Sequence, residues 1–237
     1  MKLPELRRVA FWAGIFAPIF LLLAGIFGNA GGGPPSPFQA PASELVTYYL
    51  ENGQSTVISA LLNLFGAILL AIFAAGLWQR FCDFDGQEAR GWSILGLIGT
   101  GSFCAVLMVV GVIQISLAGL AGLDEPAAEG VHAAAVMWNA GVLVIGLAAV
   151  PLLGGFSMAG LAAPAYGRWL AWTGLVGAGA GVFSALPDAV AQASVIAANL
   201  FSVIGQLELP ILFLWLIGVS FGIKRTAGVA VLDESKE

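Results

Sequence analysis

Six long apolar runs dominate this chain, and they restrict its possible folds more than any other feature of the sequence. Each run is long enough to cross the ~30 Å hydrocarbon core of a bilayer as a helix that rises about 1.5 Å per residue. The runs cover residues 10–28, 55–79, 93–121, 132–161, 169–187 and 197–223. They predict an all-α fold, an integral membrane six-helix bundle. Residues 1–225 would form a single transmembrane domain and residues 226–237 a cytoplasmic tail.

The nine lysine and arginine residues fall at the N-terminus, in every second predicted loop and at the C-terminus. They are Lys2, Arg7, Arg8, Arg80, Arg90, Arg168, Lys224, Arg225 and Lys236. Short loops that carry Lys and Arg stay cytoplasmic during insertion, so both termini are predicted to be cytoplasmic. The chain is only 10% charged, whereas a soluble domain has about a quarter charged residues. We therefore expect the lipid bilayer as its surroundings and, because no basic stripe exists, no nucleic-acid partner.

The first apolar run has a second interpretation. Arg7 and Arg8 precede it and Gly28 ends it, as in a secretory signal peptide. Its apolar core of about 18 residues is longer than that of a usual signal and fits a membrane span better. We predict a first span, and cleavage of this segment stays the alternative.

The predicted outer loop after the first run contains a candidate surface helix at residues 44–51. Ser43 is a residue type that often caps a helix N-terminus. Leu45, Tyr48 and Tyr49 would share one side of the helix, which would lie at the membrane surface, where tyrosine rings are favoured. A flexible acidic loop is the alternative.

Glycines recur in a similar pattern in two of the runs. Arg90 is followed by glycines at 96, 99 and 101, and Arg168 by glycines at 174, 177 and 179, with the same offsets. The two hairpins that contain these runs are either related repeats or alike by chance. Gly177 and Gly181 form a small-residue face, which indicates close helix packing rather than a phosphate-binding loop, because no strand precedes it.

Glu208 is the ionisable residue that lies deepest in a predicted span. A charged carboxylate there costs roughly 3 kcal/mol, so it must face the bundle interior, be protonated or touch water. Pro210 follows two residues later and removes a backbone donor, so a carbonyl one turn earlier loses its partner. A bent helix beside a carboxylate is a plausible site for an ion or a ligand.

Four predicted spans each bring one strong hydrogen-bonding group to a similar depth. Asn63, Gln114, Asn139 and Glu208 lie about five to eight residues from the outer end of their spans, which is roughly 8–12 Å of helix. His132 lies at the predicted outer mouth of the fourth span, and Trp138 precedes Asn139.

These six residues have two interpretations. The functional one is an outward-facing ligand-binding pocket, in which Glu208 is the anchor, Asn63, Gln114 and Asn139 are hydrogen-bond partners, and His132 and Trp138 lie near the entrance. The structural one is a set of interhelical hydrogen bonds, worth about 0.6 kcal/mol each, that fix helix register. An intramembrane carboxylate favours function, whereas amides alone do not.

Motifs for catalysis, metals and cofactors are missing from the sequence. One histidine and no His/Cys/Asp group at metal-ligand spacing indicate no metal site and no cofactor. Ser157 lies in Gly155-Phe156-Ser157-Met158-Ala159-Gly160, which lacks the strand–turn–helix setting of a nucleophile elbow. We therefore lean against an enzyme.

Several segments resemble a known group of proteins. They are Ser43-Glu44-Leu45-Val46-Thr47-Tyr48-Tyr49-Leu50-Glu51-Asn52, Leu77-Trp78-Gln79-Arg80 and Arg168-Trp169-Leu170-Ala171-Trp172-Thr173-Gly174. The chain is similar over nearly its full length to uncharacterised six-span bacterial membrane proteins of a domain-of-unknown-function family common in actinobacteria. The resemblance implies a six-helix bundle in a bacterial inner membrane and says nothing about activity.

We accordingly expect a protein that binds or transports a small polar or amphiphilic ligand through the pocket around Glu208. The alternative is a non-enzymatic structural or accessory subunit that docks a membrane protein partner through its glycine-rich and lipid-facing faces. An intramembrane enzyme is the least favoured, because one carboxylate without a second acid, a metal or a nucleophile is a thin catalytic set.

Overall fold

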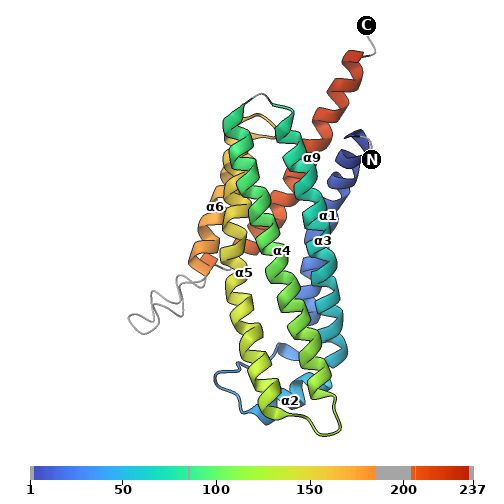
Figure 1. Cartoon of the computed structure of the whole chain (residues 1–237), viewed down its shortest axis with the longest axis vertical. Coiled ribbons are helices and arrows are strands. Elements are labelled where there is room, and N and C mark those ends of the chain that lie inside the picture. The colour runs from blue at the N-terminus through green and yellow to red at the C-terminus, as the bar shows by residue number, and fades with distance from the viewer. Residues whose placement is uncertain (1–2, 85, 185–203, 206, 235–237) are drawn as a thin grey trace. The chain divides into compact units, whose positions relative to one another are not determined.

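The computed structural model describes residues 3–84, 86–184, 204–205 and 207–234 (Figure 1). The described residues form seven α-helices and one short 3-10 helix, with no strand among them. The helices are α1 (Leu3–Gly28), η1 (Ala30–Gly32), α2 (Ala42–Glu51), α3 (Gly53–Cys82), α4 (Gln87–Ala121), α5 (Ala128–Ala162), α6 (Arg168–Ser184) and α9 (Glu208–Glu234). The prediction of an all-α protein is confirmed.

Four of these helices are long and apolar enough to cross a membrane: Glu5–Gly28 in α1, and the whole of α3, α4 and α5. They correspond to the first four apolar runs, and each begins before its run because polar residues such as Gln87 and Glu88 continue the helix outside it. A membrane-embedded helical protein follows from these lengths and compositions.

The fifth and sixth runs are described only in part. α6 covers 17 residues, and residues 185–187 of the predicted fifth span lie outside the described residues. The apolar part of α9, Glu208–Ile223, is shorter than the four long helices, and residues 197–203 of the predicted sixth span are likewise not described. α9 continues to Glu234, so the segment predicted as a tail from residue 226 begins as helix.

The chain divides into two compact units, and each is described by itself. Unit 1 comprises residues 1–18, 68–104 and 146–237, and unit 2 comprises residues 19–67 and 105–145. Helices α1, α3, α4 and α5 each contribute one segment to each unit.

In unit 1, α4 approaches α5 so closely that side chains would not fit at the contact. A methyl group added at Gly99 would collide with the backbone of Leu152, and one added at Gly96 would lie 2.7 Å from the ring of Phe156. Gly155 of α5 faces the backbone of Gly96 in return. The two helices therefore meet backbone to backbone, as small residues allow in membrane proteins.

The other side of the same α5 segment packs on glycines of α6. Gly177 lies against Leu153, with Ile211 of α9 beside it, and Gly174 lies against Ser157. The predicted packing role of the α6 glycines is thus confirmed for Gly177. In both glycine patterns the first two members are in close contact, whereas a methyl group added at the last would meet no described atom of another element within 4 Å.

Trp215 of α9 occupies the centre of the aromatic core of unit 1 and is completely buried. The rings of Phe73, Phe156 and Tyr166 surround it, with centroids 6.2, 6.5 and 6.3 Å away. Tyr166 donates a hydrogen bond of 2.6 Å to the carbonyl oxygen of Phe156, which ties the α5–α6 turn to α5. Packing therefore explains a tryptophan that lies far from the ends of its helix.

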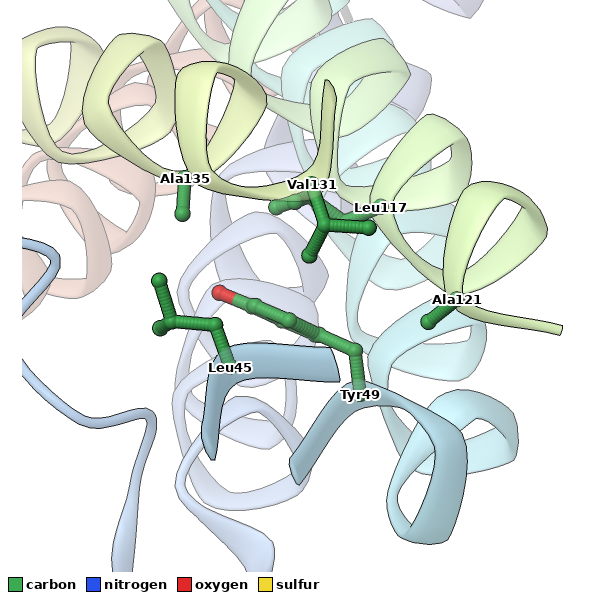
Figure 2. Close-up of a cluster of buried hydrophobic side chains, with 6 residues drawn as sticks. All are labelled: Leu45, Tyr49, Leu117, Ala121, Val131 and Ala135. Carbon is green, nitrogen blue, oxygen red and sulfur yellow. The ribbon is translucent and has the colours of Figure 1, made fainter. Parts of the chain in front are cut away.

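In unit 2, the surface helix predicted at residues 44–51 is present as α2, and it has a buried side. Figure 2 shows Leu45 and Tyr49 beneath Val131 and Ala135 of α5, next to Leu117 of α4. Burial raises the pKa of Tyr49 to about 12, so its hydroxyl stays protonated at neutral pH. Of the two interpretations of residues 44–51, the amphipathic surface helix is confirmed and the flexible loop is wrong.

The predicted cap of this helix is wrong. Pro41, in an extended conformation (φ −66°, ψ 153°), precedes the first helical residue, and no side chain caps the end. Ser43 is therefore the second residue of the helix, and its carbonyl accepts a bond from the Thr47 hydroxyl. The fixed φ of proline already sets the backbone for helix entry, which leaves no place for a serine cap.

We predict that Gly99→Ala lowers the free energy of unfolding by about 1–3 kcal/mol, because the added methyl group meets backbone that cannot yield. Gly101→Ala is the matched control two residues along α4, where a methyl group meets open space. It should be neutral or stabilise by up to about 1 kcal/mol. Thermal unfolding of both variants in one detergent measures the difference, and equal midpoints would contradict the described contact.

Candidate functional site

Glu208 is the first residue of α9, and its side chain is buried although it is ionisable, with only 3% of the residue exposed. Its Oε1 atom is buried and has no hydrogen-bond partner among the described residues. Buried carboxyl oxygens are normally paired, because leaving one unpaired is costly. An exception on a helix end inside an apolar protein is a candidate for a binding role.

The hydroxyl of Ser184 at the end of α6 lies beside this carboxyl group, since both border the same position at Gly146. The same hydroxyl lies 2.7 Å from the carbonyl oxygen of Gly181. A serine hydroxyl has one proton to donate, so it serves the carbonyl or the carboxylate, but not both at once. The carboxyl group is therefore not fully satisfied by the neighbours that the structure describes.

Two glycines form the walls around the carboxyl group. A methyl group at Gly146 of α5 would lie 2.7 Å from Oε2 of Glu208 and would collide with Oγ of Ser184. One at Gly181 of α6 would lie 3.1 Å from Oε1 and 2.8 Å from the Gly146 carbonyl oxygen. The side chain of Glu208 thus lies directly against the backbones of two helices; we call this arrangement the Glu208 niche, formed by Gly146, Gly181, Ser184 and Glu208.

Oxygen atoms dominate the Glu208 niche. The two carboxyl oxygens, the Ser184 hydroxyl and the Gly146 carbonyl come from three different elements and meet at the two glycine positions. Oxygen ligands of this kind suit hard cations and protons, whereas soft metals prefer sulfur and imidazole. The niche can therefore take up a proton or hold a small cation.

The predicted amide partners meet in unit 2. Nδ2 of Asn63 donates to Oε1 of Gln114 at 3.4 Å, and Nε2 of Gln114 contacts Oγ of Ser59 at 3.5 Å. Ser59 donates in turn to the carbonyl of Ala24 at 2.8 Å. This amide chain, Asn63–Gln114–Ser59–Ala24, links α3, α4 and α1, and it is the kind of interhelical hydrogen bonding that fixes register.

The remaining predicted residues lie near the start of α5 in unit 2. His132, Trp138 and Asn139 are half-buried. Nδ1 of His132 and Nε1 of Trp138 are buried without a partner among the described residues, and Trp138 packs against the Leu45–Tyr49 cluster. Within the described part of the chain no hydrogen bond joins these three residues to Asn63 or Gln114.

Glu208 belongs to unit 1, and the other five predicted residues belong to unit 2. The structure joins Asn63 to Gln114, and it surrounds Glu208 with residues that the sequence did not single out for this role. Gly181 carried a signal, as part of a small-residue face, but Gly146 and Ser184 carried none. One pocket containing all six residues remains a prediction.

Comparison of the chain with family models, with curated proteins and with solved structures finds no match. The geometry of the Glu208 niche is therefore the main basis for a functional argument.

We predict that Gly181→Ala pushes the carboxyl group out of the niche, because the added methyl group cannot share the space with Oε1. Gly179→Ala is the matched control on the same helix, with no neighbouring atom near the added methyl group. Carbodiimide labelling of Glu208 is quantified by peptide mass spectrometry. The labelling rate should rise in the first variant and stay at the wild-type rate in the second. Equal labelling of both variants would show that Gly181 does not confine the carboxyl group.

Proposed function

We propose that the chain is a six-span protein of a bacterial inner membrane with both termini in the cytoplasm. Four long apolar helices and the alternation of basic and non-basic loops support this topology. The resemblance of the loop segments to six-span bacterial membrane proteins points in the same direction.

We further infer that the protein binds or transports a small polar or amphiphilic ligand, and that Glu208 takes up a proton or a cation during the process. The observation that carries this proposal is the buried carboxyl group with an unpartnered oxygen between two bare helix backbones. A carboxyl group placed only for structure would be expected to have a full set of partners. The outward-facing pocket that would admit the ligand, with Asn63, Gln114, Asn139, His132 and Trp138 along it, is part of the same proposal.

Purified protein in liposomes with a trapped pH-sensitive dye tests the proposal directly. An imposed proton or sodium gradient should dissipate faster with wild-type protein than with empty liposomes. Glu208→Gln should abolish the difference, because a neutral amide neither takes up a proton nor neutralises a cation. Glu129→Gln, the same change at an exposed carboxyl group on α5, serves as the control and should transport like wild type.

Two results would count against the proposal. Identical dissipation by wild type and Glu208→Gln would remove the role of the carboxyl group. Loss of activity in Glu129→Gln as well would indicate a general effect of lost charge.

A structural or accessory subunit is the second candidate, and the amide chain in unit 2 favours it. Asn63, Gln114 and Ser59 satisfy one another across three helices, as expected of groups that hold a scaffold together. Purification at native expression level in a mild detergent separates the two candidates. A membrane protein partner that copurifies in fixed ratio supports the subunit role, and a lone monomer counts against it.

A further inference from the structure

A pair of arginines from different helices meets at one end of unit 1. Arg7 of α1 and Arg80 of α3 both contact the same oxygen of Asp83, Oδ2, with Nη1 of Arg80 at 3.4 Å. The two positive charges share one negative charge, so the group keeps a net positive charge. The guanidinium of Arg80 also lies over the ring of Phe84, 4.9 Å from its centroid, which holds the group in place.

Both guanidinium groups keep donors that the protein does not use. The Nε atoms of Arg7 and Arg80 are buried and have no hydrogen-bond acceptor among the described residues. The side chains are only 23% and 14% exposed, so water reaches them poorly. A guanidinium has five donors in a planar fork that matches two oxygens of a phosphate or carboxylate. The two guanidinium groups are therefore suited to bind a further phosphate or carboxylate.

The other described charges of α1, α3 and α4 near the arginine pair balance in number. Arg8 and Arg90 are exposed, and the exposed carboxylates of Glu5 and Glu88 match them in number. Arg90 donates to the carbonyl of Cys82 at 3.1 Å rather than to an acid. Lys2 and Asp85 have opposite charges and lie outside the described residues.

Tryptophans near the arginine pair place it at the level of lipid headgroups. Trp12 of α1 is 49% exposed, and Trp78 of α3 is 36% exposed. Exposed tryptophans near the ends of apolar helices mark the interface between hydrocarbon and water. Phosphate is the abundant anion at that level, and basic pockets between membrane helices bind lipid headgroups.

We propose that Arg7 and Arg80, held together by Asp83, bind the phosphate of an anionic phospholipid. The lipid phosphate accepts bonds from the terminal guanidinium nitrogens that Asp83 does not use, because the Nε atoms are buried, and its acyl chains lie along the apolar faces of α1 and α3. Binding joins the beginning of α1 to the end of α3. The lipid therefore stabilises unit 1, whatever the protein transports or docks.

The test measures thermal unfolding of the full chain in neutral detergent during titration with phosphatidylglycerol, phosphatidylcholine or inorganic phosphate. Phosphatidylglycerol should raise the midpoint of the wild type, and phosphatidylcholine should have little effect. Arg80→Gln should raise the phosphatidylglycerol concentration needed for half of the maximal shift by about tenfold or more, as expected for loss of a charge-assisted hydrogen bond. Arg8→Gln removes the same charge from an exposed neighbour of Arg7 and should respond like wild type.

Two further variants keep the proposal falsifiable if Arg80→Gln does not fold. Arg7→Gln should weaken the response from the other helix, and Arg80→Lys should weaken it although the charge stays, because lysine lacks the planar fork. Equal responses of Arg7→Gln and Arg8→Gln would overturn the site, and full affinity in Arg80→Lys would overturn the two-oxygen contact. A midpoint shift by inorganic phosphate equal to that by phosphatidylglycerol would overturn the lipid as the source of the anion.

Discussion

Backbone contact around α5 is the constraint on which the rest of unit 1 depends. Gly96 and Gly99 of α4 contact one side of α5. Gly174 and Gly177 of α6 contact α5 at Ser157 and Leu153. In a membrane the hydrophobic effect does not drive helices together, so such close packing supplies much of the association energy. The same closeness allows Trp215 to fill the aromatic core and brings α9 near enough for Glu208 to reach the backbone of α5.

The amide chain of unit 2 and the Glu208 niche of unit 1 differ in how their buried polar groups are satisfied. In unit 2 the amides of Asn63 and Gln114 and the hydroxyl of Ser59 form a continuous chain that ends on a backbone carbonyl. In unit 1 one carboxyl oxygen of the Glu208 niche has no partner in the described part of the chain. A satisfied network stabilises one arrangement, whereas an unsatisfied group in an apolar interior favours any ligand that completes it. This contrast supports the proposal that Glu208, rather than the amide chain, takes up a proton or a cation.

Much of the helical framework was predictable, because apolar runs of 20 or so residues have few alternatives. The starts of α4 and α5 were placed too late, since the polar residues there belong to the same helices. The tyrosines predict the surface helix α2, but the serine cap predicted at Ser43 is wrong because the helix begins one residue earlier, directly after Pro41. Glu208 was found as an isolated charge, and its walls were not, because a glycine such as Gly146 gives the same sequence signal whether it faces lipid, a helix or a carboxyl group.

The bare walls of the niche also determine how its contents can rearrange. Around most buried acids, neighbouring side chains swing aside by rotation about their own bonds, and the main chain stays still. Gly146 and Gly181 have no such bonds to turn, so these two walls move only when α5 or α6 moves, while the side chains of Glu208 and Ser184 still rotate. Any widening of the niche at its two glycine walls therefore requires a movement of α5 or α6.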